Sequence, residues 1–433
     1  MGSHNSRPDC SLCLTLNPRY ECSWCSSGCS YTHSCGPQDR VTSCPPPRID
    51  WIHPLSGPIQ GGTLVTIEGS NLGTSLEEIQ NRITIGGQPC VPANYSVSVR
   101  VTCKTAPAQG VSPLIADVIV GNRAGVTQAR DKFRYEIVDL TSIHPKIGPQ
   151  SGGTRIYLSG TNLNIGHDLE VFLDSIPCIV DKTLASSSQI SCRTTASSQE
   201  YQVKKLLLRI DNANLILENP FEYIADPTIL RIYPLKSYLS GGRTVTVLGT
   251  NLDAIQQPRL AIFGSDGSVL NESACEVLSS THMVCLSPPV NPELMDLLYR
   301  EQLDSPLQTS DPTEYDIKLR IGFLMDAVSS VKELASNFPT VHSDLGYVPD
   351  PKFYPFDGMN ENGIKLYKGE SLVIEGINLR LASTESEVNV TIGTRTCNLT
   401  SLATTQLVCM PPEVQPPGTD EIGRRTPTGL PMV

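Results

Sequence analysis

The stretch at residues 52–72, IHPLSGPIQGGTLVTIEGSNL, decides the fold of this chain because it occurs again further along. A second copy covers residues 143–163, a third covers residues 232–252, and a more divergent fourth lies within residues 353–379. The first three copies begin 91 and then 89 residues apart. A period of this length is too long for a solenoid unit and fits one small β-sandwich. We therefore predict four similar sandwiches in tandem.

The chemistry of the first copy predicts a turn followed by a strand. Pro54 restricts the backbone at the start of a first strand, and Gly61-Gly62 permits a tight turn at positive φ. Leu64, Val65 and Ile67 form a short, mostly β-branched run with partial alternation, which predicts a strand with one buried face. Gly69 and Asn71 are expected to end that strand because both tolerate left-handed conformations. None of these residues offers a nucleophile, a base or a metal ligand set, so we interpret the motif as structural.

Composition supports a chain of small all-β domains. The 433 residues include 34 Pro and 33 Gly, which is typical of short strands joined by many turns. The net charge of −11 argues against a surface for nucleic acid or anionic membrane. We find no apolar run near 18 residues and no signal peptide at the start, where residues 1–7 do not resemble a leader.

Fifteen cysteines indicate an oxidising compartment. Seven crowd into an N-terminal cluster of fewer than 40 residues, and the other eight fall two per repeat. Four Asn-x-Ser/Thr sequons agree with a secreted route and are candidate N-glycosylation sites: Asn94, Asn271, Asn389 and Asn398.

The N-terminal cluster has two interpretations. Its C-x2-C-x8-C-x2-C spacing could supply four thiolates to zinc. Disulfides are favoured, because so short a segment cannot form a packed core without cross-links and three further cysteines are present. The cluster consists of Cys10, Cys13, Cys22, Cys25, Cys29, Cys35 and Cys44.

One cysteine pair recurs at the same place in every repeat, with separations of 13, 14, 10 and 12 residues. We expect each pair to link two neighbouring strands by a disulfide, which stabilises the fold by ~3 kcal/mol in the chain-entropy model. Buried free thiols are the alternative, which the regular recurrence disfavours. The pairs are Cys90 with Cys103, Cys178 with Cys192, Cys275 with Cys285, and Cys397 with Cys409.

The repeats set the expected domains at residues 46–137, 138–225, 226–347 and 348–433, after a cysteine-rich module at 8–45. The first three end in an apolar-x-Tyr sequence, which we interpret as a closing strand with one aromatic on each face. The fourth ends 24 residues after Cys409, so we expect it to lack this strand. Junctions without long linkers predict neighbours held at limited angles, as in a semi-rigid rod or arc. The closing sequences are Phe133-Arg134-Tyr135, Phe221-Glu222-Tyr223 and Leu345-Gly346-Tyr347.

The third repeat carries an insertion within residues 286–345. Asn291-Pro292-Glu293 is a favourable helix start, and apolar residues at 294, 297 and 298 could share one face until Asp304 and Pro306 end the helix. Two interpretations stay open. The helix either covers an edge of its own sandwich or forms a partner-specific surface.

No catalytic constellation is present in the sequence. GxSxG, HExxH, GxxxxGK[ST] and a strand-linked GxGxxG are all missing. The carboxylates show no pairing suited to acid–base chemistry. His53 and His144 alternate with Tyr233 and Tyr354 at one motif position, which we interpret as a packing position. We predict no enzyme activity, no cofactor and no metal.

The N-terminal cluster resembles the cysteine-rich PSI module shared by plexins, semaphorins and integrins, through its spacing and the segment Cys22-Ser23-Trp24-Cys25. That module has eight cysteines, and its first is missing here because position 4 is His4. The resemblance implies three disulfides and leaves Cys22 unpaired: Cys10 with Cys44, Cys13 with Cys29, and Cys25 with Cys35.

The pattern I-x-P-x-x-G-P-x-x-G-G-T, followed by a strand and G-x-N-L, resembles the immunoglobulin-like IPT/TIG fold of plexins and certain transcription factors. One PSI module followed by four such sandwiches resembles the stalk of a plexin ectodomain over about residues 8–433. The resemblance implies a single-pass cell-surface receptor for semaphorins, active in axon guidance and cell migration. It also implies a ligand-binding head that this chain does not contain. We therefore expect a membrane-proximal, extracellular spacer, with homotypic or co-receptor contacts left open.

Two other functional classes share parts of this pattern. Receptor kinases of the hepatocyte-growth-factor type share this order of modules and would add a direct growth-factor site on the sandwiches. A DNA-binding protein with the same sandwich would need basic loops. The acidic charge, the paired cysteines and the four tandem copies count against that second alternative.

Overall fold

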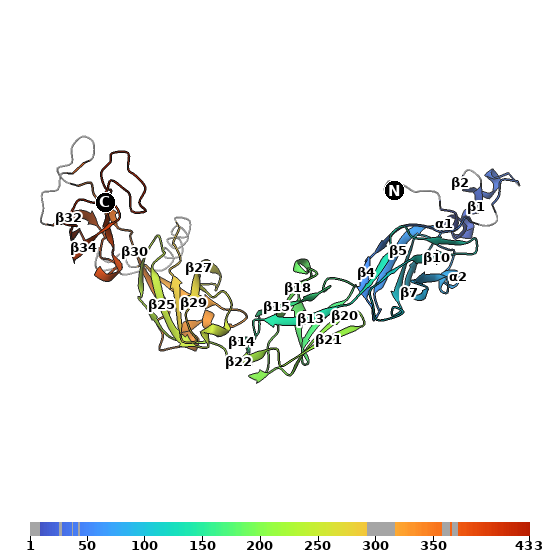
Figure 1. Ribbon diagram of the computed structural model, residues 1–433, viewed down its shortest axis with the longest axis horizontal. Helices are drawn as coiled ribbons and strands as arrows, with labels where there is room; N and C mark the ends of the chain where they lie inside the picture. Colours follow the sequence, from blue (N-terminus) through green and yellow to red (C-terminus); the bar gives the residue numbers. More distant parts are fainter. Residues whose placement is uncertain are drawn as a thin grey trace. The chain divides into compact units, whose positions relative to one another are not determined.

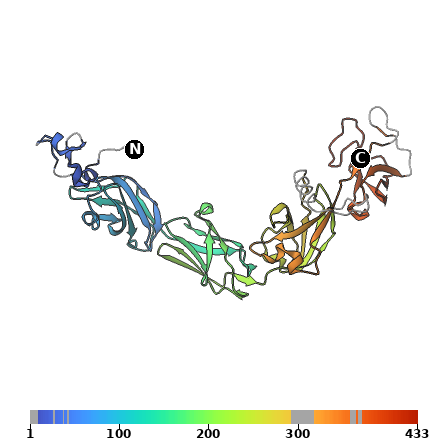
Figure 2. The ribbon, with the colours of Figure 1, turned by 180° about the vertical axis from the view of Figure 1, so that it is seen from behind.

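The computed structural model describes residues 9–25, 28–36, 38–41, 44–291, 317–356, 364–365 and 371–433. The chain forms two compact units, Met1–Ile224 and Ala225–Val433. Strands dominate both units, whichever side the molecule is seen from (Figure 1, Figure 2). The predicted all-β class is confirmed. The helix expected within the third-repeat insertion, residues 292–306, lies outside the described residues.

The first unit begins with the cysteine-rich module. A hairpin of two antiparallel strands and three short helical segments make up its described part. Asp9 caps the first helix by accepting a 2.8 Å hydrogen bond from the Leu12 amide. The elements are α1 (Cys10–Leu14), η1 (Pro18–Tyr20), β1 (Cys22–Cys25), β2 (Gly28–Tyr31) and η2 (Thr32–Ser34).

The first sandwich packs a seven-stranded sheet, in the order β11-β10-β6-β7-β8-β5-β3, against a three-stranded sheet, β4-β12-β9. Strand β5 shows the alternating burial predicted for it, with Val65 and Ile67 fully buried. The elements are β3 (Arg48–His53), β4 (Ser56–Pro58), β5 (Leu64–Ser70), α2 (Leu76–Ile79), β6 (Ile83–Ile85), β7 (Gln88–Ser96), β8 (Arg100–Thr105), β9 (Leu114–Ala116), β10 (Val118–Gly121), β11 (Val126–Gln128) and β12 (Phe133–Glu136).

The second sandwich has the same plan, with a seven-stranded sheet β13-β15-β18-β17-β16-β20-β21 and a three-stranded sheet β14-β22-β19. Only residues 137 and 138 separate β12 from its first strand. The elements are β13 (Asp139–His144), β14 (Ile147–Pro149), β15 (Arg155–Thr161), β16 (Leu169–Leu173), β17 (Ile176–Val180), η3 (Lys182–Leu184), β18 (Gln189–Thr194), β19 (Tyr201–Gln202), β20 (Lys205–Ile210), β21 (Ala213–Glu218) and β22 (Glu222–Ile224).

The second unit begins with the third sandwich, whose strands follow the order β23-β25-β28-β27-β26-β29-β30-β24. Its η5 and α4 segments add buried residues to the core. The elements are β23 (Thr228–Tyr233), β24 (Lys236–Tyr238), β25 (Thr244–Thr250), η4 (Leu252–Ala254), β26 (Arg259–Phe263), β27 (Val269–Val277), β28 (His282–Leu286), β29 (Ile317–Leu324), η5 (Ser330–Lys332), α4 (Leu334–Asn337) and β30 (Asp344–Val348).

The fourth repeat has one sheet in its described residues, in the order β31-β32-β35-β34-β33. Beyond Met410, residues 411–433 hold an isolated bridge between Thr419 and Arg425 and no further strand. The elements are β31 (Lys352–Phe353), β32 (Leu372–Ile377), η6 (Glu385–Glu387), β33 (Val390–Ile392), β34 (Arg395–Leu402) and β35 (Gln406–Met410). In the described part of the chain, no helix is long and apolar enough to cross a membrane.

Each repeat encloses its own cluster of buried apolar side chains. The closing strands differ from the prediction, because both large side chains of the apolar-x-Tyr sequence lie on one face. Phe133 and Tyr135 are buried with ring centroids 5.0 Å apart, whereas Arg134 between them is exposed. Strand residues two apart share a face, so the expectation of one aromatic per face was wrong.

The glycine of G-x-N-L has a different role from the one expected. Gly61 and Gly62 do adopt positive φ, at 69° and 87°, as predicted. Gly69 does not. It lies where a β-bulge shifts the pairing of β3 and β5, and a Cβ atom there would come within 1.9 Å of the Arg48 carbonyl oxygen. The corresponding glycines approach a backbone carbonyl in the same way: Gly160, Gly249 and Gly376.

Two further expectations were wrong. Pro54 does not start the first strand, because β3 ends at His53 and Pro54 lies between β3 and β4. The His/Tyr position before that proline is not a packing position, since its side chain is exposed in every copy. The four residues there are His53, His144, Tyr233 and Tyr354.

We predict that Gly69→Ala destabilises the first sandwich by ~3 kcal/mol, because the added methyl group forces β3 away from β5. Gly87→Ala is the matched control. It also lies in this sandwich, has φ of 74° and leaves room for a Cβ atom, so it costs about 1 kcal/mol of backbone strain. Urea unfolding followed by Trp51 emission checks this, since Trp51 lies in the displaced strand. Equal losses in the two variants would contradict the close-approach explanation.

Candidate functional site: the junctions between modules

The two ends of the repeated motif lie at opposite ends of one strand. In the first sandwich, β5 begins after the Gly61-Gly62 turn and ends at Ser70, directly before Asn71. Seven extended residues span about 20 Å, so the turn and the asparagine face different neighbours. The contacts at these two ends are the candidate functional site.

The asparagine end binds the linker that enters its own repeat. In all four copies this residue has left-handed φ, between 53° and 64°, which asparagine tolerates better than most residues. In three copies its side-chain amide donates to a backbone carbonyl of the entering linker: Asn162 to Ile137 at 2.9 Å, Asn251 to Ala225 at 3.1 Å and Asn378 to Asp350 at 3.2 Å. One side chain thus holds the chain at the point where it enters the domain.

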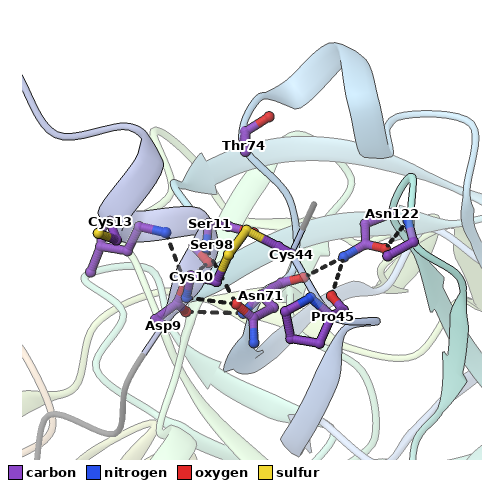
Figure 3. The surroundings of a disulfide bond; sticks show 12 residues. Asp9, Cys10, Ser11, Cys13, Cys44, Pro45, Asn71, Thr74, Ser98 and Asn122 are labelled. Carbon is purple, nitrogen blue, oxygen red and sulfur yellow. Dashed lines mark hydrogen bonds between the residues drawn. A yellow bond between two sulfur atoms is a disulfide. The ribbon is translucent and has the colours of Figure 1, made fainter. Parts of the chain in front are cut away.

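In the first copy the asparagine binds the cysteine-rich module directly (Figure 3). The side-chain oxygen of Asn71 accepts from the backbone amides of Cys10, at 2.8 Å, and Ser11, at 3.3 Å. The Asp9 carboxylate completes the contact. It accepts from the backbone amide of Asn71 at 2.9 Å and from the Ser98 hydroxyl at 2.5 Å. Two residues therefore satisfy the free amides at the start of α1 and attach the module to the sandwich.

The linker leaving this module is held at the same place. The Asn122 side-chain amide donates at 3.0 Å to both the Pro45 and the Asn71 carbonyls, as Figure 3 shows. Cys44, next to Pro45, forms a disulfide with Cys10. The covalent closure of the module and its hydrogen bonds to the sandwich therefore lie side by side.

The remaining predicted cysteines are placed as follows. Within the module, Cys13 is joined to Cys29 and Cys25 to Cys35, and Cys22 has no disulfide. Each repeat disulfide joins two adjacent antiparallel strands: Cys90–Cys103, Cys178–Cys192, Cys275–Cys285 and Cys397–Cys409.

At its other end, the first motif contacts the second sandwich. The Thr63 hydroxyl donates a 2.6 Å hydrogen bond to the Asp211 carboxylate, in the turn between β20 and β21. That carboxylate is fixed in place because it also accepts from the backbone amides of His167, at 3.1 Å, and Asp168, at 2.9 Å. Thr63 is fully buried, so water does not compete for its hydroxyl.

Backbone contacts reinforce this junction. The Gly166 amide donates to the Ser56 carbonyl at 3.0 Å, and the Asn212 amide donates to the Gly61 carbonyl at 3.3 Å. Asn212 also lies against Gly62, where a Cβ atom would meet its side chain at 2.4 Å. The glycine pair is thus needed both for the turn and for the close approach of the next domain.

In the third repeat Arg243 occupies the motif position that Thr63 has in the first, directly after the glycine pair, and it contacts the fourth repeat. Its guanidinium binds the Glu387 carboxylate through Nη2, at 2.6 and 2.8 Å, and through Nε at 3.2 Å. The side chain of Arg243 is 11% exposed and that of Glu387 is 36% exposed. Bidentate, charge-assisted hydrogen bonds of this kind fix the relative orientation of the two groups as well as their distance.

A second set of hydrogen bonds lies beside this ion pair. The Tyr238 hydroxyl lies 2.8 Å from the Ser383 hydroxyl and donates to the Leu379 carbonyl at 3.2 Å. The Ser240 amide donates to Asp350 at 2.9 Å. Asp350 belongs to the linker that Asn378 holds, so both contacts converge on the entry to the fourth repeat.

The electrostatics of Glu387 follow from these partners. Burial alone would raise the pKa of Glu387, but hydrogen bonds from Arg243 and Thr384 and the charge of Arg243 outweigh burial and lower it below 4.5. The carboxylate is therefore ionised, and the pair is intact, at neutral pH.

The four sequons differ in their surroundings. Asn94, Asn389 and Asn398 are exposed, whereas Asn271 is half-buried and its amide donates to the Pro289 carbonyl at 2.7 Å. Within the described residues, no group of three or more His, Cys, Asp or Glu side chains is arranged to hold a metal ion.

Sequence reasoning missed both ends of the motif as contact points. One signal was present, because the asparagine occurs in all four copies although many residues can end a strand. The partners Asp211 and Glu387 carry no comparable signal. Asp211 lies in the turn between β20 and β21 and Glu387 in η6, both far along the chain, and only the fold brings them to the motif.

Comparison with known proteins agrees with this architecture. The IPT/TIG domain model matches residues 47–135, 139–221, 227–315 and 362–422. Plexin-2 of Caenorhabditis elegans is 34% identical over 97% of this chain and 22% of its own length, and Plexin-B3 of Mus musculus is 30% identical over 96% and 23%. The full extracellular region of Plexin A4 superposes with a TM-score of 0.67 and 28% identity, over 95% of this chain and 33% of that structure. The chain thus spans about a fifth of the length of these curated relatives.

We predict a coupling free energy of about 1 kcal/mol between Arg243 and Glu387, because solvent partly screens the pair. A double-mutant cycle with Arg243→Ala and Glu387→Ala measures this coupling. Its readout is hydrogen exchange of backbone amides around Ser240 and Leu379, at the junction of the third and fourth repeats. Since the folded-state pKa of Glu387 is lowered, this contribution is complete above pH 4.5 and is lost as the pH falls through the lowered value. Additive effects that do not change with pH would contradict the assignment.

Proposed function

Because the chain belongs to the IPT/TIG domain family and matches plexins along nearly its whole length, we propose that it is a semi-rigid spacer in the extracellular stalk of a plexin-type receptor. The observation that carries this proposal is the direct bonding of neighbouring modules at both ends of the repeated motif. The spacer sets the distance and angle between a ligand-binding head and the membrane.

The junctions support limited motion. Each hydrogen bond across a junction contributes roughly 1 kcal/mol, and bonds to charged groups contribute more. Between β12 and β13 the linker has only two residues, and Val138 is itself buried. A domain rotating about this linker would break several hydrogen bonds together and expose apolar surface.

The rest of the receptor defines the partners in this proposal. A semaphorin binds a head domain outside this chain. The spacer then fixes the position of the ligand-bound head relative to a single-pass membrane anchor. Homotypic and co-receptor contacts of the stalk are compatible with this role. The chain lies on the extracellular side of the membrane, performs no catalysis and needs no cofactor or metal.

Two alternatives predict different binding. A stalk of the growth-factor-receptor kinase type would bind its growth factor through the sandwiches alone, whereas the spacer binds neither growth factor nor semaphorin tightly. An intracellular DNA-binding protein would bind duplex DNA and would carry free thiols.

The secreted chain is predicted to carry seven disulfides, a free thiol at Cys22 and glycans on its sequons, foremost at the exposed Asn94, Asn389 and Asn398. Seven disulfides use fourteen of the fifteen cysteines. Intact mass before and after reduction, with thiol counting and glycan removal, measures all three features. A chain with mostly free thiols and no glycan would refute the extracellular assignment.

The spacer role is tested in the full-length receptor. A flexible Gly-Ser insertion between β12 and β13 should leave semaphorin affinity unchanged and reduce ligand-dependent signalling, because the junction no longer transmits a fixed angle. The control insertion follows Gly110, in an exposed loop of the same sandwich with open space around it. Unchanged signalling in the junction variant would show that the stalk acts only as a flexible tether.

A further inference from the structure

The outer face of the first sandwich carries a continuous row of side chains across four strands. Asn94 on β7 is paired with Thr102 on β8, Thr102 with Thr66 on β5, and Thr66 with His53 on β3. The neighbours of Thr102, Val101 and Cys103, are buried, so Thr102 and the row point to solvent. The hydroxyls of Thr66 and Thr102 lie 3.3 Å apart in the middle of the row.

The far end of this row is aromatic. Trp51 lies next to His53 on β3, with ring centroids 6.3 Å apart, and 42% of its surface is exposed. Across the sheet Trp51 is paired with Glu68, which binds Arg100 through Nε at 2.6 Å. The row of two short threonines is therefore bordered by a row of longer side chains.

Asn94 begins the sequon Asn94-Tyr95-Ser96, and its side chain is exposed at the near end of the row. We propose that the N-glycan attached to Asn94 folds back along this row and stacks a sugar ring on Trp51. This inference rests on the proposed function, since the glycan is added only on the secretory route.

The distance from Asn94 to Trp51 and the chemistry of the side chains between them both fit a glycan lying along the row. Three strand spacings separate β7 from β3, which is about 14 Å, a span that the chitobiose and mannose core of an N-glycan can cover. A pyranose ring has a face of C–H groups that packs on the electron-rich face of an indole. The hydroxyls of Thr66 and Thr102 can bond sugar hydroxyls and N-acetyl groups along the way.

None of the other three sequons has an exposed asparagine on a strand at the end of a threonine row that leads to a tryptophan. The amide of Asn271 is half-buried and bonded to Pro289. Asn398 on β34 is paired with Met410, so a long apolar side chain stands where the first sandwich has the hydroxyl of Thr102. Asn389 lies just before β33, outside a strand.

The stacked glycan would have a structural consequence. Strand β3 is the edge of its sheet, and an exposed aromatic on an edge strand favours pairing with other chains. A sugar lying over Trp51 covers that edge, so the glycan would keep the first sandwich from associating with other copies.

The test uses the full chain secreted with ¹³C-labelled glycans. We expect ring-current upfield shifts of sugar C–H resonances on the Asn94 glycan, and their loss in Trp51→Leu. Trp24→Phe removes the other tryptophan of the chain and should leave the shifts intact. Trp51→Tyr keeps an aromatic ring and should retain part of the shift. Asn94→Gln should move the Trp51 indole N–H resonance, whereas Asn389→Gln should not.

Each remaining outcome overturns the inference in a distinguishable way. If Asn94 carries a glycan whose sugar resonances match those of the Asn398 glycan, stacking is excluded and the proposed extracellular function stands. If Asn94 alone is unoccupied, the inference fails while glycans elsewhere still support a secreted stalk. If no sequon is occupied and the thiols are free, the proposed function fails together with the inference.

Discussion

The hydrogen bond between a left-handed asparagine and the backbone that enters its domain is the interaction on which the rest of the architecture depends. It recurs from Asn162 to Ile137, from Asn251 to Ala225 and from Asn378 to Asp350, and in the first copy Asn71 caps the helix of the preceding module instead. The side-chain amide in this position satisfies a backbone carbonyl that would otherwise depend on water. It therefore fixes the starting point and direction of each sandwich.

One strand connects this contact to the next domain. Because β5 is paired with β8 on one side and β3 on the other, it cannot shift without breaking pairing on both sides, so it joins the asparagine to the glycine turn as a stiff element. The chemistry at the turn then differs between repeats. Thr63 uses a buried hydroxyl on Asp211, whereas Arg243 uses a bidentate ion pair with Glu387. The backbone plan is shared, and the side chains adapt each junction to its neighbour.

Much of this fold could be predicted from the sequence because it depends on local rules. The repeat spacing, the alternating burial of Val65 and Ile67 and the positive φ of Gly61 are all local. One error concerned a contact between strands, and another concerned the spacing of side chains within one strand. Gly69 is required by the Arg48 carbonyl rather than by a turn, and the faces of the closing strand follow from spacing that was misjudged. Asp211 and Glu387 could not be predicted, because their role exists only after two domains have met.

The most direct test of this account is whether neighbouring sandwiches tumble as one body in solution. Residual dipolar couplings can be measured for the first and second sandwiches in the intact chain and fitted separately. We expect alignment tensors of the same magnitude and orientation for the two sandwiches, and tensors that diverge in Asp211→Ala. Different tensors in the unmodified chain would show that the junction is a free hinge, and the spacer proposal would fail.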